Sequence, residues 1–298
     1  MSSALGSAAD DPFVTHRGLL FTVAYELLGS AADAEDVLQE SWLRWAEVDQ
    51  RRVLDPRAYL VRIVTRQALN QLRTLSRRRE VYVGEWLPEP LLTAPDVADD
   101  VELAENVSIA MLTVLETLAP TERAVFVLRE VFDVSYDEIA EAVDRSPAAV
   151  RQIAHRARDH VAARRPRVRV GRSEHEEVVA RLVAAMNTGD VQALMDVLAP
   201  DVVAVADGGG KVRGAARRPI VGAEPLSRYL MGGLAKFGAR FVMWPIQVNG
   251  ETGVRVEVDG ELVGAVSLTV ENGRVSRIYS IANPDKLARL DAVMALTR

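Results

Sequence analysis

The residues best suited to chemistry lie between Ser135 and Arg158, where apolar residues have the spacing of two short helices joined by a tight turn. Ser146 is suited to cap the second helix, and Pro147 suits its first position. The side chains expected on the outer face of that helix are Ala148, Arg151, Gln152, His155, Arg156 and Arg158. Small or long polar side chains of this kind can bond to base edges and phosphates in the major groove of DNA. The pattern predicts a DNA-binding helix-turn-helix.

A second set of polar residues lies on a helix predicted over Asp33 to Val48. Its apolar residues have helical spacing, and its outer face carries Asp33, Glu35, Asp36, Gln39 and Glu40, with Trp42 at the edge. An acidic face with an aromatic anchor suits docking on a basic helical partner. Taken alone, the same face could equally be an ordinary solvated helix surface.

A third set consists of arginines on the helix that begins at Pro56, after Asp55 as its predicted cap. The segment from Arg57 to Arg79 holds seven arginines and no acidic residue. Its polar side carries Arg62, Arg66, Arg73 and Arg77. Such a cationic surface suits the backbone of DNA that is being opened, next to a pocket for a flipped base.

The charge of the chain is patterned, although its formal net value over 298 residues is −6. The segment Arg145 to Arg169 holds eight arginines and one acidic residue, whereas Glu80 to Glu105 holds eight acidic residues and no basic one. Affinity for nucleic acid depends on local neutralisation of phosphates and not on the total charge. Two basic faces separated by an acidic connector are therefore compatible with DNA binding.

Several classes of protein are excluded by what the sequence lacks. It contains no cysteine, which excludes disulfides and thiolate zinc sites, and its four histidines are too scattered to indicate a metal site. No apolar run is long enough to span a membrane, and the N-terminus does not resemble a signal peptide. We therefore expect a cytoplasmic protein without a metal, a cofactor or a membrane partner.

The pattern changes after Gly171. Two helices are predicted over 174–188 and 191–198, followed by strands over 202–206, 239–248, 252–258, 262–270 and 275–281. Asn-Gly and Asp-Gly pairs between the later strands are strong hairpin signals. This half contains fifteen basic and fifteen acidic residues, so it has no need to touch DNA. Its predicted fold is α+β with a curved antiparallel sheet.

Three short motifs stand out between and within these elements. They are Trp86-Leu87-Pro88-Glu89-Pro90 in the acidic connector, Asp207-Gly208-Gly209-Gly210 after a strand, and Asn283-Pro284-Asp285-Lys286-Leu287 near the C-terminus. The first is a proline-stiffened segment whose tryptophan can anchor in a pocket. The glycines of the second permit close backbone approach, with Asp207 as a hydrogen-bond acceptor or a general base. In the third, Asn283 and Pro284 are suited to start a helix.

The order of these features resembles the extracytoplasmic-function (ECF) sigma factors of RNA polymerase. Leu27 to Trp45 resembles the polymerase-binding helix of sigma region 2, and Asp55 to Arg66 resembles the part that opens and reads the minus-10 element. Leu118 to Arg158 resembles sigma region 4, which binds the minus-35 element. The second half resembles SnoaL-like domains of the NTF2-like fold, and one ECF group that carries such a domain has the same three motifs.

The resemblance implies a multidomain chain: two all-α sigma domains followed by an α+β NTF2-like cone. The expected boundaries are 10–80 for region 2, 81–105 for the linker, 106–165 for region 4 and 173–298 for the cone. It also implies core RNA polymerase and promoter DNA as partners, and regulation in cis by the cone through the three motifs.

Two other functions remain open from the residues alone. One is a ligand-responsive helix-turn-helix transcription factor that acts without core polymerase. The other is an enzyme with its active site in the cone, where Asp207, Asp201, His175 and Trp244 are the candidates. No pair of these four has a spacing that specifies catalysis, and fold alone does not confer function. We therefore expect no enzymatic activity, while a small ligand of the cone stays an open question.

Overall fold

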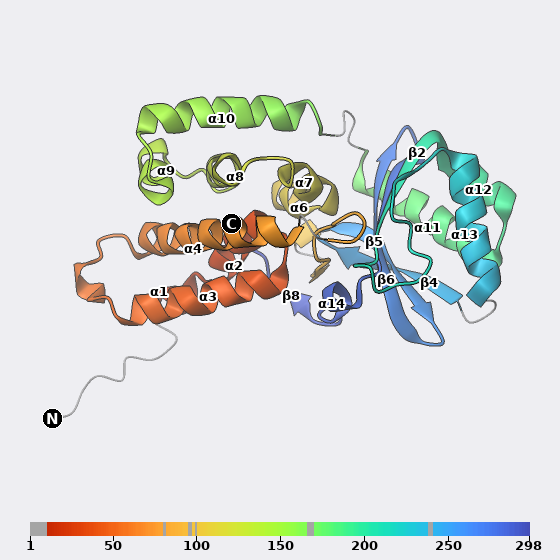
Figure 1. Cartoon of the computed structure of the whole chain (residues 1–298), viewed down its shortest axis with the longest axis horizontal. Coiled ribbons are helices and arrows are strands. Elements are labelled where there is room, and N and C mark those ends of the chain that lie inside the picture. Colours follow the sequence, from red (N-terminus) through yellow and green to blue (C-terminus); the bar gives the residue numbers. More distant parts are fainter. Residues whose placement is uncertain (1–10, 80–81, 95–96, 99, 166–169, 238–240) are drawn as a thin grey trace. The chain divides into compact units, whose positions relative to one another are not determined.

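The computed structural model describes residues 11–79, 82–94, 97–98, 100–165, 170–237 and 241–298. The chain forms two compact units (Figure 1). The helical unit contains the chain up to Arg78, Val114–Arg164 and the C-terminal residues Ala295–Arg298. The sheet unit contains Arg79–Thr113 and Arg165–Met294. The connector between the two predicted sigma domains thus belongs to the same unit as the cone.

The first part of the helical unit consists of α1 (Pro12–Thr15), α2 (Arg17–Leu28), α3 (Ala31–Ala46), a 3₁₀ turn η2 (Gln50–Arg52) and α4 (Pro56–Arg79). Helix α2 is buried along most of its length and ends at Gly29, which has a left-handed φ of 66°. The hydroxyl of Ser30 accepts from the amide of Asp33 at the start of α3, and Asp55 caps α4 in the same way at Ala58. The two helices predicted here, over Asp33 to Val48 and from Pro56, are confirmed as α3 and α4.

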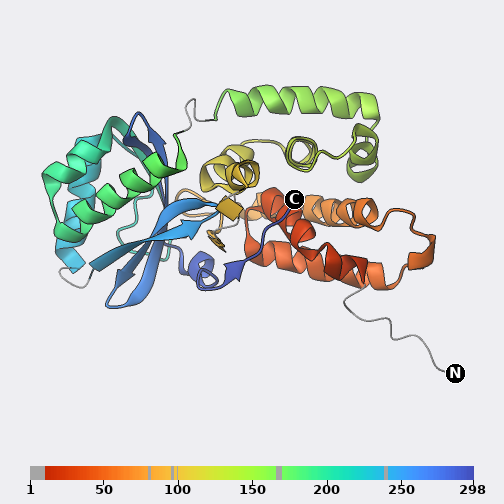
Figure 2. The same cartoon turned by 180° about the vertical axis from the view of Figure 1, so that it is seen from behind.

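The second part of the helical unit contains α8 (Pro120–Phe126), a π-helical turn η3 (Val127–Val131), α9 (Tyr136–Val143) and α10 (Pro147–Ala162) (Figure 2). Ser135 and Glu138 form a capping box at the start of α9, and Asp144 adopts a left-handed φ of 55° in the turn. The hydroxyl of Ser146 accepts from the amide of Ala149, 3.3 Å away, at the start of α10. The predicted helix-turn-helix is therefore confirmed, with the predicted cap.

The sheet unit is built on one eight-stranded sheet in the order β3-β2-β7-β6-β5-β4-β1-β8. Its strands are β1 (Leu92–Thr93), β2 (Leu198–Asp207), β3 (Ile220–Val221), β4 (Phe241–Val248), β5 (Glu251–Val258), β6 (Glu261–Glu271), β7 (Arg274–Ile281) and β8 (Val293–Met294). The three tight turns predicted from their sequence have positive φ at both central residues, as in Asn249-Gly250. The predicted hairpins are confirmed. The sheet is mixed and not purely antiparallel as predicted, because β2 pairs parallel to β7.

Three helices cover one face of this sheet: α11 (Arg172–Thr188), α12 (Val191–Val197) and α13 (Ala223–Phe237) (Figure 1). Their apolar sides and the inner side of the sheet form one core, in which Val179, Leu194 and Val254 are fully buried. A short helix, α14 (Pro284–Leu287), follows the last long strand. The structure thus has the α+β arrangement predicted for this half; below, "cone" means residues 172–290.

The connector is folded against the cone, and below it is called the linker (residues 82–113). Strand β1 joins the sheet edge, antiparallel to β4 at Val248 and parallel to β8 at Val293. Two helices follow, α6 (Val101–Val107) and α7 (Ile109–Leu115). Ser108, with an extended ψ of 145°, separates these two helices.

A second apolar cluster joins the linker to the cone. Leu87 and Ile109 of the linker pack with Ala265, Ile281 and other buried residues of β4, β6, β7 and the C-terminal turn.

Within the described ranges, no helix combines the length and the apolar character that a membrane crossing requires.

Candidate functional site

The outer face of α10 presents all six of the residues that the sequence predicts to contact DNA from this helix. Ala148, Arg151, Gln152, His155, Arg156 and Arg158 are exposed. The guanidinium of Arg151 lies 5.6 Å from the ring centre of Tyr136, and Arg158 approaches Glu130 of η3 at 3.6 Å. These contacts orient long side chains on a surface that remains open to solvent.

The acidic face of α3 is partly exposed and partly engaged. Asp36, Gln39, Glu40 and Trp42 are exposed, whereas Asp33 accepts from Gln71 at 3.0 Å and Glu35 pairs with Arg17 at 2.7 Å. Trp42 packs edge-on against Phe13, with ring centres 5.2 Å apart. Leu43 beside it is 59% exposed and was missed by the sequence analysis. The surface offered to a partner thus combines carboxylates with two large apolar side chains.

Two of the arginines of α4 that are predicted to bind DNA contact the helix-turn-helix in this structure. Arg62 Nη1 pairs with Glu141 Oε2 of α9 at 2.5 Å, and Arg66 Nη2 donates to the backbone carbonyl of Glu141 at 2.7 Å. Arg73 is exposed and donates to Asn70. The side chain of Arg77 lies outside the described residues. In this arrangement, Glu141 occupies cationic groups that suit a DNA backbone.

A buried arginine fastens the same two parts of the helical unit together. Arg123 of α8 is 3% exposed; its Nη1 donates to the carbonyl of Leu27 at 2.9 Å and pairs with Glu116 at 2.6 Å. Burial lowers the pKa of Arg123 to about 9, so its guanidinium is still charged at neutral pH. Below, "closed arrangement" means the contacts of Glu141 with α4 and of Arg123 with α2.

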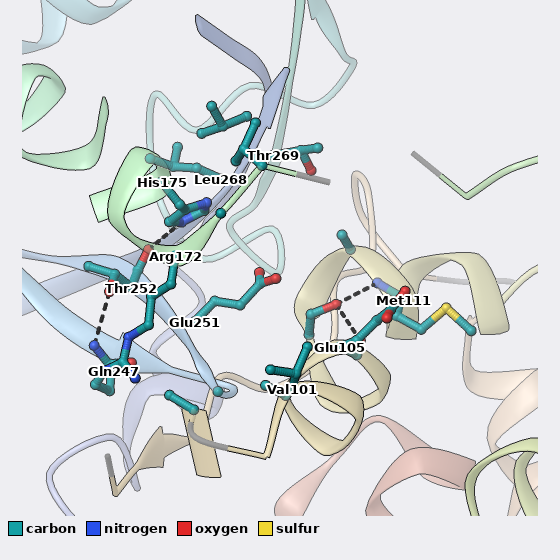
Figure 3. A pocket seen from close by; sticks show the side chains of 18 of the residues that line it. Val101, Glu105, Met111, Arg172, His175, Gln247, Glu251, Thr252, Leu268 and Thr269 are labelled. Atoms are coloured by element: carbon teal, nitrogen blue, oxygen red, sulfur yellow. Dashed lines mark hydrogen bonds between the residues drawn. The ribbon is translucent and has the colours of Figure 1, made fainter. Parts of the chain in front are cut away.

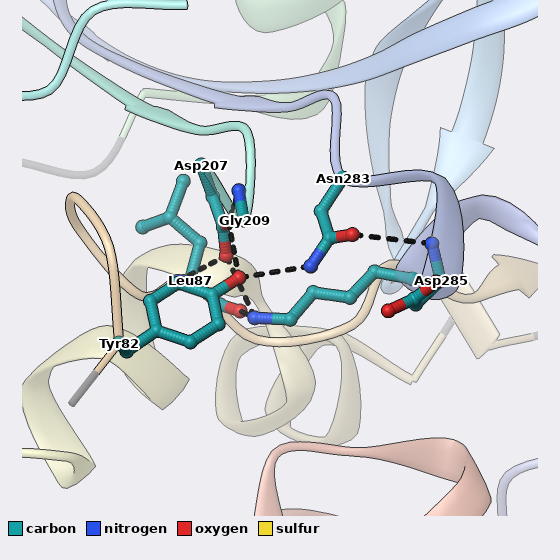
Figure 4. A network of polar contacts seen from close by, with 7 residues as sticks. Tyr82, Leu87, Asp207, Gly209, Asn283 and Asp285 are labelled. Carbon is teal, nitrogen blue, oxygen red and sulfur yellow. Dashed lines mark hydrogen bonds and ion pairs between the residues drawn. The ribbon is translucent and has the colours of Figure 1, made fainter. Parts of the chain in front are cut away.

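The three sequence motifs meet at one carboxylate in the sheet unit (Figure 4). Asp207, at the end of β2, is fully buried and accepts four hydrogen bonds. The donors are Tyr82 Oη at 2.6 Å, the amide of Leu87 at 2.9 Å, the amide of Gly209 at 3.0 Å and Lys286 Nζ at 2.7 Å. Two of these four donors belong to the linker. Asp207 is thus an acceptor that holds the linker to the cone.

Lys286 completes this cluster, and its side chain is buried. Its ammonium also donates to the carbonyl of Leu87 and lies 4.0 Å from the ring centre of Trp86. Burial, and then the neighbouring Asp207, raises the pKa of Tyr82 well above its ordinary value, so its hydroxyl remains a donor. Below, "Asp207 junction" means Tyr82, Trp86, Leu87, Asp207, Asn283 and Lys286.

The rest of the two C-terminal motifs supports the junction. Asn283 Nδ2 donates to Tyr82 Oη at 2.9 Å, and Asn283 Oδ1 accepts from the amide of Asp285, as predicted for a helix cap. Gly209 has a φ of 58°, and a Cβ there would lie 2.5 Å from Asn283 Nδ2. A side chain at Gly209 would therefore displace Asn283. Pro88, Glu89 and Pro90 are buried in the linker, whereas Gly210, Pro284 and Asp285 are exposed.

A second clamp on the linker was not predicted. Asn249 is fully buried in the β4–β5 turn; its Oδ1 accepts from the amide of Leu91 at 2.8 Å, and its Nδ2 donates to the carbonyl of Val107 at 2.7 Å. The carbonyl of Val107 lies where α6 breaks before α7. Next to it, a Cβ on Gly250 would lie 2.7 Å from the Cα of Ala104, so only glycine allows this approach.

Family models match both parts of the helical unit. The model described as Sigma-70 region 2 matches residues 13–78, which include the acidic face of α3 and the arginines of α4. The model described as Sigma-70, region 4 matches residues 108–161, which include the helix-turn-helix. The chain belongs to the ECF family of RNA polymerase sigma factors, since it also matches members of that family over nearly its full length.

Among these relatives is the ECF RNA polymerase sigma factor SigJ of Mycobacterium tuberculosis, which is 41% identical over 291 residues (92% of this chain and 91% of SigJ). The probable ECF RNA polymerase sigma factor SigI of the same species is 30% identical over 280 residues, which cover 93% and 94% of the two chains. The crystal structure of M. tuberculosis SigJ superposes with a TM-score of 0.74 and 38% identity, covering 93% of this chain and 97% of that one. A sigma factor directs core RNA polymerase to promoter DNA, so a transcription factor that acts without polymerase is not favoured.

Proposed function

We propose that this sigma factor is regulated in cis by its cone, which keeps the linker docked and thereby favours the closed arrangement. The observation that carries the proposal is the pair of bonds from Arg62 and Arg66 to Glu141. In the closed arrangement these arginines are bonded to the protein and are not available to phosphates. Productive promoter binding then requires the two sigma regions to separate.

The roles of the exposed surfaces follow from their chemistry. We assign Arg151, Gln152 and His155 of α10 to base contacts in the minus-35 element, with the other exposed residues of that face on phosphates. The arginines of α4 serve the minus-10 element once they are released from Glu141. The exposed part of α3, with Trp42 and its carboxylates, serves as the docking surface for core polymerase. The chain then works in the cytoplasm, where core polymerase transcribes.

The length of the linker explains how docking can control promoter reach. Fully extended, residues 82–113 would span roughly 100 Å at about 3.3 Å per residue. In the docked linker, α6 and α7 advance only about 1.5 Å per residue. The Asp207 junction and Asn249 hold both ends of this shortened segment on the cone. Release of the linker would lengthen the connection between regions 2 and 4.

Reconstituted transcription with core polymerase tests the proposal. The template is a promoter selected with the wild-type chain, in versions whose spacer between the two elements differs by up to three base pairs. Asp207→Asn should raise transcription several-fold and broaden the range of spacers that are used, because the linker loses its main acceptor. Asp201→Asn is the matched control, since Asp201 is an exposed residue of the same strand. Equal spacer profiles for the two variants would contradict the proposal.

A truncated chain gives an independent check of cis-regulation. Removal of Ser173–Arg298 takes away Asp207, Asn249 and Lys286 together. If promoter-directed transcription stayed unchanged after this removal, the cone would have no regulatory part.

We assign no catalytic role to the cone. Asp207, the strongest candidate for a general base, is buried beneath four hydrogen-bond donors. Trp244 is exposed on β4 and Asp201 is exposed on β2. His175 bonds to the backbone of Thr252. The four residues thus lie in separate environments, which does not support a shared active site.

A further inference from the structure

A cavity of about 490 Å³ lies in the sheet unit, between the linker helices and the cone (Figure 3). The linker contributes Val101, Glu105 and Met111, and the cone contributes His175, Gln247 and Leu268 among others. Small-molecule sites commonly have volumes of about 300–1,000 Å³. The residues of the Asp207 junction are not among the described residues that line this cavity, so it is a separate feature of the linker–cone contact.

One residue that lines the cavity, Gln247, carries a buried acceptor without a partner in the described part of the chain. Gln247 Nε2 donates to the hydroxyl of Thr252 at 3.0 Å, but Gln247 Oε1 is buried without a hydrogen bond. A buried carbonyl oxygen that loses its water contacts and gains no donor is costly. An atom of this kind on a cavity wall indicates that a donor belongs there.

The ring of His175 offers a second acceptor. His175 Nε2 lies 2.8 Å from the carbonyl of Thr252, and because a carbonyl can only accept, this nitrogen carries the hydrogen. Burial lowers the pKa of His175, so the ring is neutral near pH 7. Its Nδ1 therefore carries a lone pair. His175 and Gln247 both line the cavity (Figure 3).

The rest of the lining is apolar or balanced in charge. Two acidic residues, Glu105 and Glu251, and two arginines, Arg165 and Arg172, line the cavity. Glu105 pairs with Arg165, and Arg172 pairs with Glu176. The formal charges of these four lining residues sum to zero. Val101, Met111, Leu268 and Val270 supply the apolar surface.

We propose that this cavity binds an uncharged small molecule with an apolar body and a hydroxyl or amide N–H that donates to Gln247 Oε1 or His175 Nδ1. Its occupant touches α6 and α7 on one side and the β4–β5 hairpin, which carries Asn249, on the other. It therefore binds the docked linker and not the released one. At ten times its dissociation constant, such a ligand multiplies the ratio of docked to released linker about elevenfold. This effect on the linker rests on the proposed function, whereas ligand binding does not.

Two matched probes test the site on the full-length chain, without polymerase or DNA. The first is 2-naphthol, which has an apolar body and one hydroxyl donor; the second is 2-methoxynaphthalene, which has the same body and no donor. Binding is followed by saturation-transfer NMR and fluorescence titration. We expect 2-naphthol to bind roughly fivefold more tightly, the effect of one neutral hydrogen bond. Equal affinities for the wild-type chain would overturn the ligand assignment without the need for any variant.

A substitution then locates the donor contact. Gln247→Met keeps the size of the side chain and removes its acceptor, so the two probes should bind this variant about equally. Gln192→Met is the control, because Gln192 is exposed on α12 and does not line the cavity; it should keep the preference for 2-naphthol. A preference that survived Gln247→Met would place the ligand elsewhere.

Hydrogen exchange tests the effect on the linker separately. Saturating 2-naphthol should slow amide exchange in residues 101–113 at least twofold as well as in the β4–β5 hairpin. Slower exchange in the hairpin alone would remove the linker from the proposal and leave the ligand site in place. The spacer series described above uses no ligand, so its failure and a failure of binding are distinguishable.

Discussion

Asparagine in place of Asp207 keeps the size of the side chain and removes its charge. Lys286 is 9% exposed and is left without its anionic partner. Each carboxylate oxygen of Asp207 accepts two hydrogen bonds. The NH₂ group of asparagine would replace one of these oxygens and, being a donor itself, would face two donors. Loss of one partner from a buried ion pair costs about 3–5 kcal/mol. We therefore expect the free energy of unfolding of the sheet unit to fall by about that amount.

Thermal unfolding and hydrogen exchange measure this effect together. A loss of about 3–5 kcal/mol corresponds to a fall of roughly 10 °C in the melting temperature of a unit of this size. Amides of residues 82–91 should lose most of their protection, because Leu87 and Tyr82 lose their acceptor. The exposed control Asp201→Asn should change stability by less than about 0.5 kcal/mol. If Asp207→Asn had the same melting temperature as the control and its linker amides stayed protected from exchange, the Asp207 junction would not hold the linker to the cone.

Three further predictions concern other parts of the chain. Burial raises the pKa of Glu26 to about 8, so between pH 4.5 and 8 the folded chain holds a proton that the unfolded chain has lost. The free energy of unfolding of the helical unit should therefore fall by about 1.4 kcal/mol per pH unit in this range. Urea unfolding at pH 5.5, 6.5 and 7.5 measures this slope, and Glu26→Gln should flatten it. Asn249→Asp keeps the hydrogen bond from the amide of Leu91 and sets a carboxylate oxygen against the carbonyl of Val107. This change should lower the free energy of unfolding by about 2–3 kcal/mol and speed amide hydrogen exchange at the start of α7. Unchanged exchange would refute the role of Asn249 as a clamp. Arg151→Ala should lower transcription from a matching promoter about 5- to 150-fold, whereas Arg181→Ala on α11 should not, and equal losses would argue against base contact by Arg151.

Local patterns were predictable wherever a residue type determines its own backbone. Ser146 with Pro147 predicted the start of α10, and Asn-Gly pairs predicted the hairpin turns, because these residues satisfy or relax the backbone without help from distant parts of the chain. Helix α13 was missed since Pro225, Gly232 and Gly233 lower its intrinsic helix propensity; packing on β2 offsets this.

Contacts between distant residues could not be predicted. The motifs around Trp86, Asp207 and Lys286 were recognised as motifs, but no spacing in the sequence indicates that they share one carboxylate. Asn249 was predicted only as a turn residue, and nothing in the sequence indicates that its buried side chain also bonds to Leu91 and Val107 of the linker. Arg62 has the same polarity whether it faces a phosphate or Glu141, so the sequence alone could not reveal the closed arrangement.

The order of residues along the chain determines when the linker can dock during synthesis. The linker, residues 82–113, leaves the ribosome before each group that holds it: Asp207, Asn249, Lys286 and the strand partner Val293. At about 5–20 residues per second, the interval between Val161, where region 4 ends, and Lys286 lasts roughly 6–25 s. During that time both sigma regions are complete, and the groups that hold the linker are not yet all present. On the proposed function, a nascent chain is thus a sigma factor that its cone does not yet restrain.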